Sequence, residues 1–242
     1  MQRRIASTTG RIEVHVSNRD DIYDPLRREN LGRSVQWALQ ETKPIPLGTV
    51  RDLSFNGCGI YAIYYVGDHD LYKPLADHPF EVPIYVGRST PEGSRTGSDV
   101  KSPEESKSLR SRLMTHENKI KRANGLKIDD FYTRFLPADD LFTPMAESMM
   151  ITELQPVWNV ILHGFGVNTP GDGRKNQTRS KWHEVHRGVP AGDALPPHPG
   201  GPGPLRRQVI LHLATHAVRP AHAAGVPPTA DSLESDGALP SE

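Results

Sequence analysis

The stretch Cys58-Gly-Ile-Tyr-Ala-Ile-Tyr-Tyr-Val66 decides the fold, because no other segment of the chain is as typical of a β-strand. β-Branched and aromatic residues dominate it, and it lies between the turn residues Asn56-Gly57 and Gly67-Asp68, which is the pattern of a strand. Shorter strands are expected at 82–86 and at 130–136, where apolar and polar residues alternate. The polar segment 88–106 is expected to be an exposed loop.

Helical patterns surround these strands. One helix is expected to begin at Asp24, with Pro25 at its first position, and to end before Lys43. Further helices are expected over 108–123 and 143–154, and a short one over 177–186. The apolar positions expected to face the core are Leu26, Leu31, Val35, Trp37 and Leu39 in the first helix, and Met145, Met149 and Leu154 in the third.

Composition excludes several classes of protein. The chain has 242 residues, no net charge and one cysteine, Cys58, so neither an intrachain disulfide framework nor a four-cysteine zinc site can form. No apolar run approaches the roughly 20 residues that cross a bilayer, and a cytoplasmic protein without membrane attachment is expected. Residues 101–127 hold eight basic against three acidic side chains, and residues 160–189 hold five against two. On charge alone, a solvated surface is favoured over a phosphate-binding one.

Two short motifs lie on the first two expected strands, Gly59-Ile60-Tyr61 and Tyr85-Val86-Gly87. Each tripeptide alone is a weak signal, because any aromatic-rich strand can contain it. The polar residues that follow strengthen it: Arg112 and His116 are four apart on one expected helix, so they project from the same face. The full ordered set of polar residues is Tyr61, Tyr85, Arg112, His116, Glu147 and Asn159.

In this order, the motifs and polar residues resemble the GIY-YIG nuclease superfamily, over residues 59–159. Further features resemble the branch of type II restriction enzymes with SacII-like specificity. These features are the segments 108–116 (SLRSRLMTH) and 154–159 (LQPVWN), Gly164-Phe165-Gly166, and the basic segment that ends at Trp182. The resemblance implies an α+β fold: a small three-stranded, mostly antiparallel sheet flanked by helices, with an N-terminal helical and a C-terminal basic extension.

The resemblance also implies roles in hydrolysing a phosphodiester bond of DNA. Tyr61 would act as the general base or orient the attacking water, with Tyr85 close by. Because a phenol has a pKa near about 10, basic neighbours or a metal must lower it, or the tyrosine acts only by hydrogen bonding. Arg112 would contact the scissile phosphate with its planar donor fork, and His116 would assist proton movement near the nucleophile.

The two remaining polar residues complete the implied site. Glu147 would hold one Mg²⁺ through its carboxylate, with Mn²⁺ as an alternative metal. Asn159 would fix the geometry of Tyr61, of Glu147 or of the phosphate. A lone glutamate or histidine on a helix is more often solvated, and only its place in the ordered set reverses that interpretation.

A restriction enzyme cuts both strands of a short palindrome, so a homodimer on double-stranded DNA is expected, with a tetramer as the alternative. The SacII-like resemblance implies a CCGCGG-type target and a cognate DNA methyltransferase in the host. Most basic residues at such an interface contact phosphate, and a few contact guanine. The residues expected to contact DNA are Arg88, Lys107, Arg110, Arg174, Lys175, Arg179 and Lys181.

The chain divides into four expected parts. Residues 1–50 form an N-terminal extension for DNA or dimer contact, with a strand at 11–16, and residues 51–162 form the GIY-YIG module. Residues 163–189 form a basic DNA-contacting segment. Residues 190–242 form a Pro/Gly/Ala-rich tail that is expected to be disordered, because such a composition buries little apolar surface. Removal of 195–242 is therefore expected to leave activity intact.

Three other interpretations remain open at this stage. A GIY-YIG nicking or repair nuclease would cut branched or damaged DNA rather than one sequence, and the basic segments outside the module favour restriction over it. A catalytically inactive DNA-binding protein would be expected to have lost some of the six polar residues, and all are present. A structural protein with chance motifs is the third.

Overall fold

A four-stranded antiparallel sheet forms the centre of the protein. The computed structural model describes residues 24–94, 101–166 and 177–218. The strands are β1 (Ile45–Pro46), β2 (Gly59–Tyr65), β3 (Tyr85–Ser89) and β4 (Phe131–Pro137), in the order β1-β4-β2-β3. The α+β class is confirmed, and the sheet has one strand more than expected: the two-residue β1, which pairs with the outer edge of β4.

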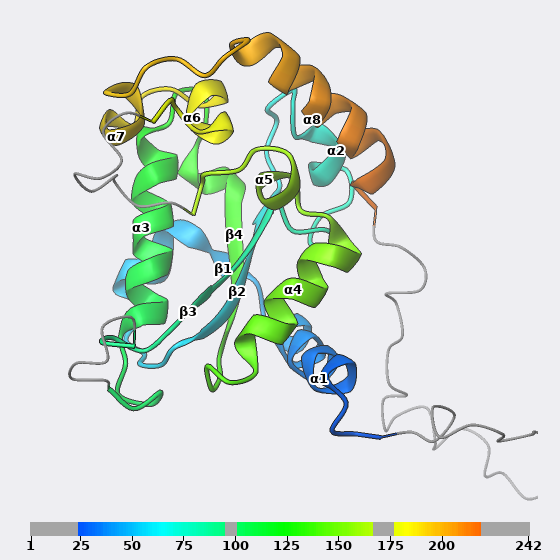
Figure 1. Cartoon of the computed structure of the whole chain (residues 1–242), viewed down its shortest axis with the longest axis vertical. Coiled ribbons are helices and arrows are strands. Elements are labelled where there is room, and N and C mark those ends of the chain that lie inside the picture. Colours follow the sequence, from blue (N-terminus) through cyan, green and yellow to red (C-terminus); the bar gives the residue numbers. More distant parts are fainter. Residues whose placement is uncertain (1–23, 95–100, 167–176, 219–242) are drawn as a thin grey trace, which may run out of the picture.

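Strand β2 is buried on both faces. Ile60, Ala62 and Tyr64 pack in one core cluster with residues of α1 (Arg28–Glu41) and α4 (Thr143–Leu154). Tyr61 and Ile63 face a second, larger cluster, which contains residues of α3 (Ser108–Arg122) and α5 (Val157–Val160). Figure 1 shows α3 on one side of the sheet and α1 with α4 on the other. Burial on both faces explains why β2 reads as an almost continuous apolar run.

Short helical turns connect these elements. They are the 3₁₀ helices η2 (Leu47–Asp52) and η3 (Ile128–Asp130) and the single-turn α2 (Lys73–Ala76). Helices α3 and α4 lie where the sequence predicts them, to within a residue or so. The expected strand at 11–16 lies outside the described residues.

The expected apolar faces of α1 and α4 were partly wrong. Helix α1 begins at Arg28, and Leu26 before it is 75% exposed. Its buried residues are Gly32, Gln36 and Leu39, and a Cβ at Gly32 would lie 2.3 Å from the sulfur of Met149. The buried residues of α4 are Thr143, Ala146, Met150 and Leu154. Gly32 therefore lets α1 approach α4 closely at Met149, a contact that apolar periodicity alone does not reveal.

The prediction of a disordered tail was wrong for residues 190–218. After α6 (Lys181–Val185), helices α7 (Pro190–Asp193) and α8 (Pro202–His216) form within these residues, and α8 lies beside α2 (Figure 1). Leu205, Val209 and Leu213 lie four apart and are buried in the larger core cluster. This spacing forms an apolar stripe on a helix, which the surrounding Pro and Gly residues concealed.

The expected domain boundaries at 162 and 190 do not separate independent cores. The larger cluster contains Leu47 from the N-terminal part, Ile63 from the sheet, and Val209 from α8. A hydrogen-bonded group links distant segments: the Tyr72 hydroxyl lies 2.5 Å from His186 Nε2 and accepts from Trp158 Nε1 at 3.0 Å. The expectation that residues 195–242 can be removed without loss therefore conflicts with the packing of α8.

Leu213→Ala tests whether α8 belongs to the core. Leu213 is 2% exposed, so the change is expected to lower the free energy of unfolding by about 3 kcal/mol through the cavity it leaves. Leu211→Ala is the matched control on the same helix, where the side chain is 72% exposed and the cost is expected below about 0.5 kcal/mol. Urea unfolding measures both, and equal losses would contradict the packing of α8.

Candidate active site

Tyr61 and His116 form a buried hydrogen-bonded pair at the centre of the candidate site. Tyr61 lies on β2 and His116 on α3, and both side chains are fully buried. The Tyr61 hydroxyl lies 2.7 Å from His116 Nε2. A buried polar group needs such a partner, because its desolvation is otherwise uncompensated.

Burial keeps both members of this pair neutral. It raises the pKa of Tyr61 well above its usual value, and the neighbouring Tyr85 adds to the rise while Arg112 opposes it. It lowers the pKa of His116 well below its usual value, and the charges of Arg112 and Lys119 lower it further. The phenol proton therefore stays on Tyr61 at neutral pH, and the hydroxyl can donate it in a hydrogen bond to Nε2.

Tyr85 and Arg112 lie against this pair. The ring of Tyr85 is 6.2 Å from that of Tyr61 and 5.3 Å from that of His116, measured between centroids. Burial raises the pKa of Tyr85, whereas the charge of Arg112 and hydrogen bonds with Tyr61 and Arg112 oppose that rise. Arg112 also opposes the rise in the pKa of Tyr61. A single guanidinium is therefore shared by the two tyrosines.

Gly87 leaves the space that the tyrosine pair occupies. It lies opposite Tyr61 in the β2–β3 register. A Cβ at Gly87 would lie 2.5 Å from the Tyr61 hydroxyl and 2.9 Å from the ring of Tyr85, closer than atoms can approach without movement. The Tyr-Val-Gly motif thus ends in glycine because the two phenols pass over its backbone.

Asn159 fixes the strand rather than a reacting group. Its side-chain amide accepts from the backbone N–H of Val86 and donates to the carbonyl of Val86, both at 2.8 Å. The backbone N–H of Trp158 donates to the carbonyl of Ile84 at 3.0 Å. Strand β3 is at the sheet edge, so α5 supplies the partners that a further strand would have given. Asn159 thereby holds the backbone between Tyr85 and Gly87.

Glu147 extends from α4 to the outer edge of the sheet. One of its carboxylate oxygens accepts from Arg88 Nε at 2.9 Å, and the side chains of Glu147 and Arg88 are 25% and 34% exposed. Burial raises the pKa of Glu147, while Arg88 and then Arg112 oppose that rise. Glu147 is therefore close enough to Arg112 for their charges to interact.

A hard divalent cation fits this donor set only if substrate completes it. Among the described residues, no group of three or more His, Cys, Asp or Glu side chains could hold a metal. Mg²⁺ in proteins often takes one or two carboxylates together with waters and substrate phosphates. Glu147 suits that arrangement as a single carboxylate ligand, and the described residues do not surround the position with further carboxylate, histidine or cysteine ligands.

Sequence reasoning missed the role of two groups near the pair. The ring of Phe165 stacks on His116 at 4.5 Å and 20°. Lys119 Nζ donates to the Phe165 carbonyl at 2.7 Å, and Arg112 donates to the carbonyl of Gly166. Burial lowers the pKa of Lys119 to about 8. The Gly164–Gly166 turn was noted only as a motif, and the basic composition of α3 gave no sign that Lys119 points inward.

One family model matches most of the chain. It is described as the Eco29kI GIY-YIG domain, and it matches residues 53–213. The chain belongs to this family. The match confirms the GIY-YIG resemblance, and it extends through most of α8, which agrees with the packing of that helix; it does not address SacII-like specificity. No curated protein gave a significant match.

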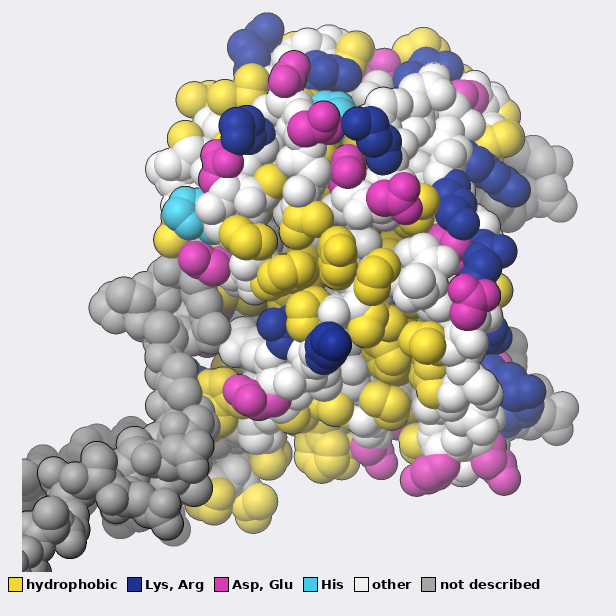
Figure 2. Space-filling view, turned by 180° about the vertical axis from the view of Figure 1, so that it is seen from behind, with side chains coloured by type: hydrophobic (Ala, Val, Ile, Leu, Met, Phe, Trp, Pro, Cys, Tyr) yellow, Lys and Arg dark blue, Asp and Glu magenta, His cyan; other side chains and the backbone are white. Residues whose placement is uncertain are grey.

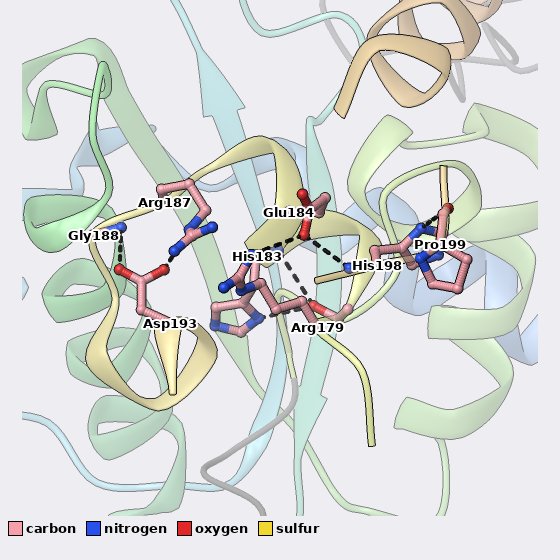
Figure 3. Close-up of polar contacts among 9 residues, drawn as sticks. Arg179, His183, Glu184, Arg187, Gly188, Asp193, His198 and Pro199 are labelled. Carbon is pink, nitrogen blue, oxygen red and sulfur yellow. Dashed lines mark hydrogen bonds and ion pairs between the residues drawn. The ribbon is translucent and has the colours of Figure 1, made fainter. Parts of the chain in front are cut away.

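The GIY-YIG domain of this chain holds Arg179 inside the protein. The prediction that Arg179 contacts DNA disagrees with its geometry, because it is 8% exposed and its guanidinium lies 3.3 Å from the carboxylate of Glu184. Figure 3 shows this ion pair, together with the backbone N–H of His198 that donates to the same carboxylate oxygen. The segment 177–198 folds back on itself through these bonds.

The other expected DNA contacts have mixed surroundings. Arg174 and Lys175 lie outside the described residues. Arg110 donates to the backbone carbonyls of Leu53 and Arg51, and Arg88 pairs with Glu147. Lys107 is exposed and Lys181 is half-buried. DNA contact by these four remains a prediction.

Gly87→Ala tests the close approach of the tyrosines. The added methyl is expected to displace Tyr61 from His116 and to lower the rate of DNA cleavage about 100-fold, because such misplacement alone is that costly. Single-turnover cleavage of plasmid DNA measures the rate, with circular dichroism to confirm folding.

Gly203→Ala is the control for this change, because a Cβ there meets only a flexible arginine end at 3.9 Å. A folded Gly87→Ala protein that cuts as fast as the unchanged protein would contradict the packing argument.

Proposed function

We propose that the chain is a Mg²⁺-dependent type II restriction endonuclease, which hydrolyses both strands of double-stranded DNA at a short palindromic, GC-rich site. Family membership supports a DNA endonuclease. The observation that carries the catalytic part is the 2.7 Å contact between Tyr61 and His116 beside Arg112. The CCGCGG-type target rests on the sequence resemblance alone.

In the proposed reaction, Tyr61 relays a proton instead of acting as a preformed phenolate. Burial disfavours the phenolate and also a standing imidazolium, so the proton is proposed to move along the 2.7 Å contact only as the water attacks, to the accepting nitrogen of neutral His116. As water attacks phosphorus, its proton passes to the Tyr61 oxygen while the phenol proton passes to His116 Nε2. The water oxygen forms the new bond to phosphorus. The bond to the departing sugar oxygen breaks with its electron pair on that oxygen, which then takes a proton from solvent.

Arg112 is the proposed ligand of the scissile phosphate. Its planar donor fork matches two phosphate oxygens, and it already lies against both phenols. In this structure it also donates to the carbonyl of Gly166, and Tyr61 has no exposed surface. Binding of DNA therefore requires the phosphate to take the place of that carbonyl at the guanidinium.

Glu147 is the proposed metal ligand, for Mg²⁺ or for Mn²⁺. The ion would supply positive charge at the phosphate and at the leaving oxygen. The partial exposure of Glu147 and the interaction of its charge with that of Arg112 support a metal ligand beside the proposed phosphate site.

A homodimer, or a tetramer, is proposed because two sites related by a twofold axis match a palindrome. Figure 2 shows a group of hydrophobic side chains in the middle of the face opposite to that of Figure 1, with charged side chains mostly around it. Such apolar surface supports contact with a second copy. The proposal also requires a cognate methyltransferase in the host.

The proposed location is the cytoplasm, where host DNA and its methyltransferase meet. Within the part of the chain that the structure describes, no helix has the length and apolar character of a membrane span.

Cleavage of plasmid DNA tests the proposal. With Mg²⁺, the purified protein is expected to give discrete fragments whose sequenced ends share one palindrome. Glu147→Gln is expected to lose at least about 100-fold in rate, because it removes the metal's charged ligand. Glu153→Gln on the same helix is the control, since Glu153 contacts Gln36 and Arg33 away from the site.

Other outcomes would point elsewhere. Equal cutting of any branched or damaged DNA would favour a nicking or repair nuclease. Tight, salt-sensitive DNA binding without cleavage would favour an inactive DNA-binding protein. A folded protein that neither binds nor cuts DNA would contradict the proposal altogether.

A further inference from the structure

Arg88 forms an ion pair with Glu147, the carboxylate that is proposed to bind the metal. It follows Gly87 on β3 and lies on the same face of the sheet as Val86, the face that α4 covers. Its Nε atom lies 2.9 Å from Glu147 Oε2. The pair joins β3 to α4 at the edge of the site, beside the glycine over which the tyrosines pass.

The contact has the properties of a replaceable ion pair. It uses Nε rather than both terminal nitrogens of the fork, and each side chain is between a quarter and a third exposed. Partly exposed pairs of this kind are weakly stabilising. A planar guanidinium has a better partner in a phosphate, which accepts two parallel hydrogen bonds.

A divalent cation and the Arg88 guanidinium compete for Glu147. A metal bound to a carboxylate oxygen would lie within a few ångströms of a guanidinium on the same carboxylate, where like charges repel strongly in a partly buried site. The described residues offer no other cluster of metal ligands. The free protein is therefore expected to bind metal weakly, with Arg88 as the resident cation.

We propose that Arg88 is the counter-ion of Glu147 in the DNA-free protein and transfers to a DNA phosphate when metal binds, which makes metal and DNA binding cooperative. This inference rests on the proposed metal role of Glu147. DNA would strengthen metal binding in two ways: its phosphate would draw Arg88 away from Glu147, and its phosphate oxygens would complete the coordination shell. By linkage, metal strengthens DNA binding by the same factor. The free enzyme consequently holds little metal, and the loaded site forms on DNA.

Mn²⁺ binding to the DNA-free protein tests the inference without any cleavage. Isothermal titration with Mn²⁺ is expected to give a dissociation constant about tenfold lower for Arg88→Met than for the unchanged protein. Arg88→Lys retains a cation beside Glu147 and is expected to stay within a few-fold of the unchanged protein. Arg122→Met removes an exposed charge at the end of α3 and controls for net charge.

The reciprocal measurement uses Ca²⁺ and a short duplex that contains CCGCGG, with binding followed by fluorescence anisotropy. Ca²⁺ is expected to tighten duplex binding strongly for the unchanged protein and several-fold less for Arg88→Met. Thermal unfolding confirms that each variant is folded.

Failure of the inference differs from failure of the proposed function. If Glu147→Gln loses Mn²⁺ binding while Arg88→Met binds Mn²⁺ no more tightly than the unchanged protein, Arg88 does not compete and the inference is overturned alone. If Glu147→Gln binds Mn²⁺ as well as the unchanged protein, the proposed metal ligand is wrong and the inference falls with it. Equal tightening by Arg122→Met would also overturn it, because the effect would then be one of net charge.

Discussion

The buried hydrogen bond between Tyr61 and His116 is the constraint on which the rest of the site depends. It joins the central strand to α3 where neither side chain is exposed in the DNA-free protein, and His116 Nε2 would have no hydrogen-bond partner without the Tyr61 hydroxyl, at a cost in desolvation. Nearby features keep the two rings in register. Gly87 leaves room for the phenol, and Phe165 lies flat against the imidazole. Asn159 holds the edge strand that carries Tyr85 and Gly87. The tyrosine can therefore remain neutral and still pass a proton to a fixed acceptor.

The C-terminal part of the chain packs against the Tyr61–His116 pair and the larger core, and it is not a separate appendage. The Gly164–Gly166 turn is fastened to α3 by two cationic side chains, and its phenylalanine covers the histidine. Trp182 of α6 packs in turn on Phe165 and Trp158, and α8 closes the larger core. The site is thus built from β2, β3, α3 and α4 together with residues more than 100 positions after the first strand, which fits a family match that extends to residue 213.

The sequence predicted the structure where the local preference for helix or strand agrees with the packing. It did not where a contact with a residue elsewhere in the chain decides whether a side chain is buried. The strand around Tyr61 and helix α3 follow from a β-branched run and from helical spacing. Strand β3 begins at Tyr85, later than the expected 82–86, and ends at Ser89, inside the expected loop. The four-residue separation of Arg112 and His116 placed both on one face. Periodicity could not show which charges turn inward, because burial of Arg179 depends on Glu184, an acid that pairs with it only in the folded chain. Composition concealed α8, since three apolar residues at helical spacing were outnumbered by Pro, Gly and Ala.

A double-mutant cycle on the buried pair tests the account most directly. Single-turnover cleavage of plasmid DNA would be measured for Tyr61→Phe, His116→Leu and the double variant, each verified as folded by circular dichroism. If the two side chains act as one proton relay, either change removes the relay, and the double variant should be no more than about threefold slower than the slower single variant. Losses that multiply would mean that Tyr61 and His116 act independently, and the central claim would be wrong.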